Sequence, residues 1–153
     1  MNISLRKMEE RDIDRILEIE KKSFTSPWPR KSFEFEIKSN LMARYIIVER
    51  AGCILGYIGL WFMVDESHVV SIAVDPEYRE NGLGKMLMKA GIIESMLAGM
   101  NAMTLEVRKS NIAAKKLYKK LGFNSVGIRP KYYEDNKEDA IIMWKYFKDV
   151  EKC

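Results

Sequence analysis

Residues 71–85, SIAVDPEYRENGLGK, carry the pattern that decides the fold: an apolar strand, a turn with two glycines and the start of a helix. The strand ends at Val74, and the apolar stripe of the helix begins at Leu83. A helix start presents unpaired backbone N–H groups and the positive end of the helix dipole, which together favour phosphate. Gly82 and Gly84 carry no Cβ, so a bulky anion can approach the backbone there. The turn is therefore a candidate phosphate-binding loop.

Two well-known phosphate loops do not fit this turn. A Walker A motif would need glycine at position 79 and serine or threonine after Lys85, whereas the chain has Arg79 and Met86. A dinucleotide fingerprint starting at Gly82 would need glycine or alanine where Leu87 stands. The alternative is that Gly82 has only a structural role and allows a tight strand-to-helix turn.

Hydrophobic periodicity on both sides of the turn predicts further strands and helices. Before it, the signals give a strand at 2–7, helices at 12–23 (with Asp12 as a cap) and after Pro29, and strands at 43–50, 54–62 and 68–74. After it, they give a helix at 83–99, a strand at 103–107, a helix through 114–121 closed by Gly122, and strands at 124–129 and 140–147. Ala51-Gly52-Cys53 reads as the turn of an antiparallel hairpin. We expect a mixed α/β sheet with helices on its faces.

Composition limits the classes of protein that this chain can belong to. With 153 residues, 47% apolar and 31% charged, it is neither disordered nor fibrous, and one domain is the natural count. The lone histidine, His68, excludes sites that need two imidazoles. Cys53 and Cys153 form no CxxC pair, which argues against a zinc ribbon or a disulfide framework. We therefore expect a reduced, cytoplasmic protein without a bound metal.

The sequence also argues against a membrane protein. Residues 1–12 are charged almost from the start, unlike a secretory signal. The apolar run 53–64 is shorter than the roughly 20 residues that a membrane helix needs, so it predicts a buried strand. Cys153 is the last residue, so prenylation of the CaaX kind is not expected. The net charge of +4 and the pI near 9.0 indicate an affinity for nucleic acid, acidic lipid or a phosphorylated cofactor.

Several blocks of sequence, taken together, resemble the GNAT-type N-acetyltransferase superfamily. The segment R-x-x-G-x-G at 79–84, after a strand ending IAVDP, resembles the acetyl-coenzyme A pyrophosphate loop of that family. The other blocks are LEVR at 105–108, SNIAA at 110–114, LYKKLGF at 117–123, and RPKYY at 129–133 with EDAIIM at 138–143. The last pair is similar to the subgroup that acetylates protein N-termini, including the ribosomal-protein alanine N-acetyltransferases.

The resemblance implies a fold, a co-substrate and a set of binding residues. The fold is α/β, a single N-acetyltransferase domain over residues 1–153, with a mixed, mostly antiparallel sheet of about six or seven strands and about four flanking helices. The co-substrate is acetyl-CoA, and no metal is implied. Backbone N–H groups on the splayed strand that ends at residue 74 bind the acetyl carbonyl and pantetheine, at Ile72, Ala73 and Val74, although core packing also explains these side chains. The pyrophosphate loop comprises Arg79, Glu80, Asn81, Gly82, Leu83, Gly84 and Lys85.

Glu106 matches the residue that the family implies as a general base acting through water. It alternates with Leu105 and Val107 on a predicted strand, so it faces away from them. An unpaired buried carboxylate is costly, so Glu106 must reach a cleft or a partner. A solvated or salt-bridged glutamate is the alternative without a catalytic role.

Three further residues have a functional and a structural interpretation. Tyr118 shares a helix face with Leu117 and Leu121, which fits a core tyrosine, whereas the resemblance implies that its hydroxyl protonates the coenzyme A thiolate. Asn111 fits a helix cap, and it also matches a residue that contacts the cofactor. His68 is interpreted as a packed or edge histidine rather than a catalyst.

The expected substrate is the α-amino group of a protein N-terminus. About 10–15% of such a group is neutral at pH 7, against about 0.04% of a lysine side chain, so one carboxylate with water is a sufficient base. Trp28, Tyr132 and Tyr133 fall in the loops that flank the peptide groove of the resembling family. For Trp28 the alternative is a hydrophobic staple under its loop. A ribosomal protein is the candidate partner, and no membrane partner is expected.

Two other functions stay open at this stage. One is acetylation of a small-molecule amine, and the other is a basic module that binds RNA or the ribosome without catalysis. The basic run could be a solvated helix face or could favour the cofactor phosphates; it comprises Arg108, Lys109, Lys115, Lys116, Lys119 and Lys120. Aromatic residues do not interleave with it as a base-stacking platform requires, so nucleic acid is not the expected partner.

Overall fold

The computed structural model describes residues 2–147, so the expectation for Cys153 lies outside the described residues. The strands are β1 (Ile3–Lys7), β2 (Ala43–Arg50), β3 (Cys53–Met63), β4 (Glu66–Val74), β5 (Ala102–Arg108), β6 (Asn124–Arg129) and β7 (Ala140–Tyr146). The helices are α1 (Ile13–Ser23), α2 (Arg30–Lys38), α3 (Leu83–Leu97) and α4 (Ile112–Lys120), with 3-10 turns η1 (Glu10–Asp12) and η2 (Pro76–Tyr78). The predicted elements are confirmed, with ends that differ by one or two residues.

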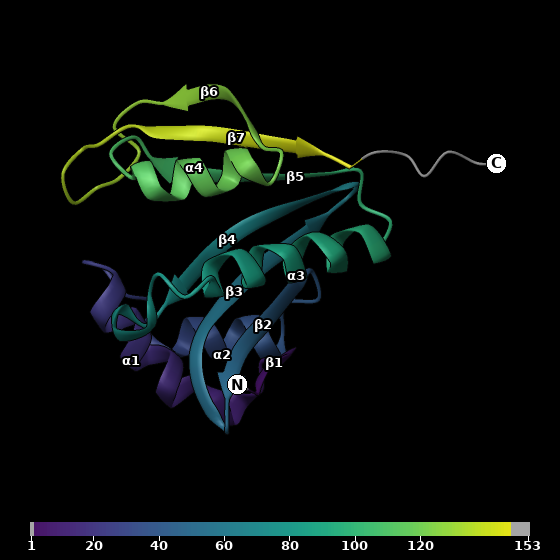
Figure 1. Ribbon diagram of the computed structural model, residues 1–153, viewed down its shortest axis with the longest axis vertical. Coiled ribbons are helices and arrows are strands. Elements are labelled where there is room, and N and C mark those ends of the chain that lie inside the picture. The colour runs from purple at the N-terminus through teal and green to yellow at the C-terminus, as the bar shows by residue number, and fades with distance from the viewer. Residues whose placement is uncertain (1, 148–153) are drawn as a thin grey trace.

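The seven strands form one sheet in the order β1-β2-β3-β4-β5-β7-β6 (Figure 1). Every neighbouring pair is antiparallel except β4 and β5, which are parallel. This confirms the mixed, mostly antiparallel sheet and its four helices. The last hairpin folds back so that β7 lies between β5 and β6, which leaves β6 at the edge.

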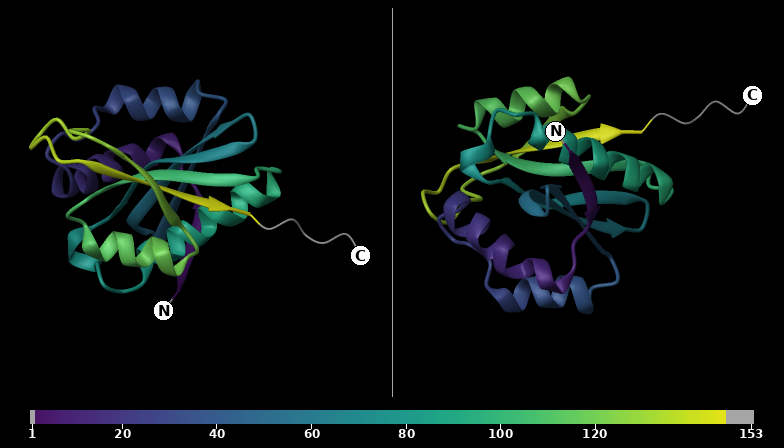
Figure 2. Two further views of the ribbon diagram at one scale, coloured as in Figure 1. Left: turned by 90° about the horizontal axis from the view of Figure 1, so that it is seen from above. Right: turned by 60° about the horizontal axis from the view of Figure 1, so that its bottom comes forward.

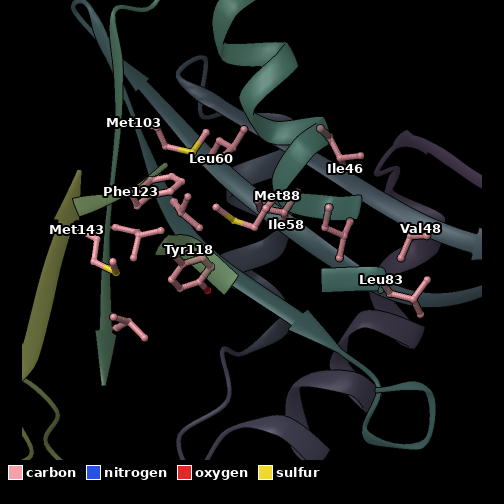
Figure 3. Close-up of a cluster of buried hydrophobic side chains, with 14 of the residues drawn as sticks. Ile46, Val48, Ile58, Leu60, Leu83, Met88, Met103, Tyr118, Phe123 and Met143 are labelled. Atoms are coloured by element: carbon pink, nitrogen blue, oxygen red, sulfur yellow. The ribbon is translucent and has the colours of Figure 1, made fainter. Parts of the chain in front are cut away.

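The helices cover both faces of the sheet, and the left view in Figure 2 shows α1 and α2 on one side and α3 and α4 on the other. The α3 and α4 side holds a core cluster in which Met88, Tyr118, Phe123 and Met143 are buried (Figure 3). A second cluster lies under α1 and α2 around Phe33, whose side chain is 0% exposed. Among the described residues, no helix combines the length and apolarity needed to cross a membrane.

Local signals decide where several elements begin and end. Gly122, at φ +97°, follows α4 in the left-handed conformation that glycine adopts readily. Ala51 and Gly52 both have positive φ in the tight turn between β2 and β3. Asp12 stands at the N-cap position of α1, as predicted, but its carboxylate makes no capping bond into that helix. It accepts instead from Arg6 at 2.8 and 2.9 Å and from the Glu9 N–H at 2.7 Å.

Candidate active site

Strands β4 and β5 separate partway along their length and so open the sheet. They pair only from Glu66 with Ala102 to His68 with Thr104, and Figure 1 shows them meeting at one end and diverging toward the other. Val70 is a bulge in β4, because the register against β3 skips it. The expected splay of this strand from its neighbour is therefore present, and it leaves backbone groups of both strands without partners in a sheet ladder.

A groove of about 950 Å³ lies where the two strands diverge. Its walls come from the end of α1, β4, β5, α4 with its cap, and the loops between α1 and α2 and between β6 and β7. The groove brings together seven of the residues singled out from the sequence: Trp28, Ile72, Glu106, Asn111, Tyr118, Tyr132 and Tyr133. The other predicted cofactor-binding residues, 73–74 and 79–85, are not part of this lining. They lie at the end of β4 and in the segment that leads from η2 into the first turn of α3.

Glu106 reaches the groove from β5 and has a protein partner at each oxygen. His68 Nε2 lies 2.6 Å from Oε2, and Arg129 Nε donates to Oε1 at 3.3 Å. We call Glu106, His68 and Arg129 the charged network. The hydrogen bond from His68 is the largest cause that lowers the pKa of Glu106, and it outweighs the opposite effect of burial. Glu106 is therefore an ionised carboxylate at neutral pH.

His68 is not an edge histidine, because β4 is paired on both sides at this point. It pairs with Trp61 in β3 and Thr104 in β5. Since Glu106 is ionised, His68 Nε2 carries the hydrogen of the bond between them. The interpretation as a packed residue is confirmed in part, since the ring is 22% exposed, but its contact with the groove carboxylate was not predicted.

Tyr118 is both a core residue and a groove residue. Its side chain is 7% exposed and its ring packs against Phe123 at 6.0 Å between centroids. Burial raises the pKa of Tyr118 to about 12, so the phenol keeps its proton at neutral pH. Within residues 2–147 the hydroxyl has no hydrogen-bond partner, so it is available to a bound molecule.

An ion-pair and ring cluster fixes the loop between β6 and β7 over the groove. Arg108 donates to Asp135 at 2.8 Å and to Glu138 at 3.3 Å, and its guanidinium lies 4.0 Å from the ring centroid of Tyr133. Thr25, in the loop between α1 and α2, donates to Asp135 at 2.9 Å. The two loops that flank the groove are thus joined directly to each other.

The three aromatic residues predicted to bind a peptide lie in these two loops. Tyr132 and Tyr133 meet edge to face with ring centroids 5.1 Å apart. Trp28 lines the groove, and its ring also packs on Phe33 at 5.4 Å. The staple and the groove interpretations of Trp28 are therefore both compatible with its position.

The turn before α3 has the backbone geometry of an anion site. Gly82, the N-cap residue of α3, has φ +76° and no side chain that could cap the helix. A Cβ added at Gly82 would meet no atom within 4 Å. The first-turn N–H groups of α3 have no carbonyl partner within the helix and no side-chain cap from Gly82, so an anion can accept from them. Arg79 is exposed and donates to the Val74 carbonyl at 3.2 Å, which ties the loop to the end of β4.

Asn111 caps α4, because its side chain accepts from the Ala114 N–H at 3.1 Å. The helix-cap interpretation is confirmed, and Asn111 is at the same time part of the groove lining. In the part of the chain from residue 2 to 147, no three His, Cys, Asp or Glu side chains gather as metal ligands would.

Sequence reasoning missed several contacts at the groove. Those of His68, Arg129 and Arg108 join distant strands and loops, and His68 and Arg129 act on the groove only through Glu106. Glu20 also lines the groove, and here a signal was present. It falls seven residues after Ile13 and four after Ile16, on the apolar face of α1, where a carboxylate requires an explanation.

Comparison with known proteins gives consistent matches over most of the chain. The acetyltransferase (GNAT) family matches residues 13–123. A Bacillus subtilis protein, provisionally named a ribosomal protein bS18-alanine N-acetyltransferase, is 43% identical over 141 residues, which cover 92% of this chain and 93% of that protein. The ribosomal protein bS18-alanine N-acetyltransferase of Escherichia coli K12 is 38% identical over 140 residues, 89% of this chain and 92% of that one.

The fold of a solved relative also superimposes on nearly the whole chain. The crystal structure of the ribosomal-protein-S18-alanine N-acetyltransferase from Escherichia coli aligns with a TM-score of 0.87 and 31% identity. The alignment covers 99% of each chain. The overall fold is therefore shared with this relative over nearly the whole of both chains.

Proposed function

The chain belongs to the acetyltransferase (GNAT) family and is an acetyl-CoA-dependent N-acetyltransferase, and from this premise we propose that its acceptor is the α-amino group of a protein N-terminus. One observation carries the proposal: the groove between β4 and β5 gathers an ionised carboxylate, a protonated phenol and three aromatic rings on two joined loops. The relatives are named for an alanine of ribosomal protein bS18, so a ribosomal-protein N-terminal alanine is the first substrate to test.

The residues along β4 and α3 fit acetyl-CoA. When bound, this co-substrate supplies the acetyl thioester that an amine attacks. The open first turn of α3 and the positive φ of Gly82 suit the pyrophosphate, with Arg79 and Lys85 as nearby cations. The N–H groups of Ile72 and Val74 suit the acetyl carbonyl and pantetheine, because β4 has left its parallel partner before these residues. The N–H of Ala73 points the other way, toward β3, as the alternation of an antiparallel pair requires. Asn111 and Tyr118 would complete the site from α4.

In the proposed mechanism, Glu106 and Tyr118 handle protons at the two ends of the reacting group. Glu106 accepts, through a water molecule, the proton that the amine nitrogen loses as it forms the amide bond. Tyr118 donates its proton to the leaving sulfur. The opposite pKa directions of these residues support the assignment, since one is ionised and the other protonated at neutral pH.

The joined loops support a chain end as the substrate. The hydrogen bond between Thr25 and Asp135 spans the groove between its two flanking loops, and the Tyr132 and Tyr133 rings offer flat apolar surface beside it. An extended N-terminal segment fits such a passage better than a loop bearing a lysine. A cytoplasmic location and a ribosomal-protein partner are part of the same proposal.

The proposal is tested with peptides whose amines differ. The protein and acetyl-CoA are mixed with peptides that begin with alanine, serine or methionine, with N-terminally blocked lysine peptides, and with polyamines, and products are read by mass spectrometry. We expect acetylation of free N-terminal peptides and little of the other amines. Acetylation of polyamines or lysine peptides without any N-terminal product would contradict the proposal.

A matched glycine pair tests the cofactor loop. Gly82→Ala and Gly52→Ala both force alanine into positive φ, at +76° and +81°, and neither new Cβ meets an atom within 4 Å. Each should destabilise the fold by about 1–2 kcal/mol. Only Gly82→Ala should weaken acetyl-CoA binding, which is measured by the increase in Tm that the ligand causes. For the wild type at an acetyl-CoA concentration of 100 times Kd, this increase corresponds to a stabilisation of about 2.7 kcal/mol. Equal shifts in both variants would remove this loop from the binding site.

A further inference from the structure

A second carboxylate, Glu20 on α1, lies in the wall of the same groove. Its side chain is 1% exposed, yet the residue is part of the groove lining. The Tyr57 hydroxyl of β3 donates to Glu20 Oε1, and the Trp28 backbone N–H donates to the same carboxyl group. Glu20 is therefore fixed by hydrogen bonds at the boundary between the groove and the core.

The hydrogen bonds continue from Glu20 to the strand that opens the sheet. The Tyr57 hydroxyl lies 2.8 Å from Ser71 Oγ, and either oxygen can donate. Ser71 is half-buried, lies in β4 beyond the point where β4 and β5 part, and lines the groove. We call Glu20, Tyr57 and Ser71 the neutral network. It forms a continuous chain of oxygen atoms from the groove to a buried carboxylate.

No cation balances Glu20, in contrast to Glu106. Across residues 2–147 it makes no ion pair with a lysine, arginine or histidine. The titratable groups that face it are Tyr57 on β3, then Tyr45 on β2, which in turn binds Glu36 on α2. Burial raises the pKa of Glu20, with the bonds from Tyr57 and Trp28 opposing the shift. Glu20 is thus the stronger base of the two groove carboxylates.

We propose that the neutral network removes the first proton from the bound substrate ammonium, with Ser71 contacting the amine and with Glu20 and Tyr57 as positioning residues that receive the proton through it. The inference rests on the proposed function, because it needs an N-terminal amine in the groove. Two protons must leave an ammonium before it becomes an amide. The two carboxylates of the groove divide this task.

The transfer balances atom by atom. The ammonium nitrogen gives one proton to Ser71 Oγ, Ser71 gives its own to the Tyr57 oxygen, and Tyr57 gives its own to Glu20 Oε1. The neutral amine then forms a C–N bond with the acetyl carbon while the C–S bond breaks. The second amine proton leaves through water to Glu106, and the sulfur takes a proton from Tyr118. Glu20 and Glu106 release one proton to solvent and one to Tyr118, so the net products are amide, thiol and one proton.

The fold supplies a matched control for this network. Glu36 is a second buried carboxylate, 4% exposed, that accepts from the Tyr45 hydroxyl at 2.8 Å and from Trp61 Nε1 at 2.6 Å. The Tyr45 and Tyr57 rings are stacked with centroids 6.3 Å apart. Glu36 and Tyr45 therefore repeat the arrangement of Glu20 and Tyr57 in the same core, but neither lines the groove.

The pH profile of kcat/KM for an N-terminal peptide tests the proposal. An α-amino group is about 3% neutral at pH 6.5 and about 90% neutral at pH 9, a ratio of about 30. Wild type can use the ammonium form, whereas Glu20→Gln can use only the amine that is already neutral. The loss in Glu20→Gln should therefore approach about 30-fold at pH 6.5 and fall below about twofold at pH 9. Tyr57→Phe should show the same pH-dependent loss.

Control variants and a direct titration separate the relay from a general loss of folded protein. Glu36→Gln and Tyr45→Phe should give the same ratio to wild type at both pH values, because their network does not reach the groove. Carboxyl-carbon NMR of wild type should show a raised pKa for Glu20. Thermal unfolding of each variant identifies loss of folded protein, which would lower activity equally at every pH.

Each outcome has a single meaning. Three results would overturn the relay and leave the proposed function intact. They are a loss of kcat/KM in Glu20→Gln that is equal at pH 6.5 and 9, no loss of kcat/KM at all, or an ordinary pKa of Glu20. A wild type that acetylates no N-terminal peptide at any pH would overturn the proposed function itself, and the relay with it.

Discussion

The groove contains two carboxylates whose surroundings differ in kind. Glu106, in the charged network, is held by His68 and Arg129, and the hydrogen bond from His68 is the main reason why its pKa is lowered. Glu20, in the neutral network, is held by hydroxyl and amide groups only, and burial raises its pKa. The same side chain is thus a weaker base on β5, where the bond from His68 outweighs burial, and a stronger base on α1, where burial outweighs the bonds from Tyr57 and Trp28.

The difference shows how one groove can accept two protons from one substrate. Groups whose environments push their pKa values apart are suited to different steps of a reaction. Glu106, bonded by His68 and Arg129, is ionised at neutral pH and ready to accept a proton, whereas Glu20, which has no cation beside it, keeps a proton once it receives one. The experiments below act on the two networks and on their neighbours, in order of decreasing expected effect.

Glu106→Gln should have the largest effect on turnover. The amide keeps the size of the side chain but accepts no proton, so kcat should fall by about 10²–10⁴-fold. The loss should persist at every pH, in contrast to the loss in Glu20→Gln, which disappears when the amine is already neutral. Steady-state kinetics at pH 6.5 and 9 measure both. The affinity for acetyl-CoA should stay nearly unchanged, because Glu106 lies on β5, away from the α3 turn.

A Glu106→Gln variant with wild-type kcat would remove this residue from the proposed role. A variant that recovers at pH 9, as expected for Glu20→Gln, would mean that the two carboxylates act on the same proton, and the division of labour would be wrong.

Tyr118→Phe should lower kcat by about 10²-fold, at the lower end of what general acids contribute. The free energy of unfolding should change by less than about 1 kcal/mol, because the hydroxyl has no partner among residues 2–147 and leaves none unpaired. Tyr133→Phe is the matched variant, since burial also raises the pKa of Tyr133 to about 12. That variant should act on the KM of the peptide instead. Equal kcat in wild type and Tyr118→Phe would contradict the role as acid.

Local patterns predicted much of this site, because they depend on neighbours in the sequence. Period-two alternation placed Glu106 opposite Leu105 and Val107, and the structure confirms it: both apolar side chains are buried and Glu106 turns to the groove. The glycine turn before α3 and the cap at Asn111 were likewise readable, since φ and capping depend on a few adjacent residues.

Contacts between distant segments could not be predicted in the same way. His68 and Glu106 meet because β4 and β5 pair in parallel for only three residue pairs, a register that no local pattern encodes. Arg108 meets Asp135 across 27 residues because the end of β5 pairs with the start of β7, next to the loop that carries Asp135, and no local pattern encodes this pairing either. Glu20 is a different case, because its position on the apolar face of α1 was visible in the sequence and only its partner Tyr57 was not.

Arg108→Lys should raise the KM of the peptide by about three- to tenfold with little change in kcat. Lysine keeps the charge but loses the planar group that binds Asp135 and stacks on Tyr133, so the loop between β6 and β7 should move more freely. Arg44→Lys is the control, because its guanidinium also lies over a ring, that of Phe62 at 5.1 Å, but it does not line the groove. Equal peptide KM values in the two variants would show that the loop cluster does not order the substrate site.

His68→Ala should have the smallest effect, and it acts on the pKa of Glu106. Without the bond to Nε2, the pKa of Glu106 should rise toward its usual value of 4.5, since this bond is the main cause of the lowering. Because the folded pKa of Glu106 lies below the unfolded value, the pair stabilises the fold above about pH 4.5 and loses this contribution as the pH falls through the folded pKa. His68→Ala should therefore be less stable than wild type by about 1 kcal/mol at pH 7.

The gap between wild type and His68→Ala should close at low pH, where Glu106 is protonated in both proteins and no longer attracts the histidine. Urea unfolding at pH 7 and pH 3 measures it, and His68→Gln separates the two causes, because glutamine can still donate to Oε2 but never carries a charge. If His68→Gln keeps the stability of wild type at pH 7, the hydrogen bond lowers the pKa of Glu106, and if it behaves like alanine, the charge does. A gap that is the same at both pH values would mean that His68 stabilises the fold by packing alone, and the contrast between the charged and neutral networks would then rest on Arg129.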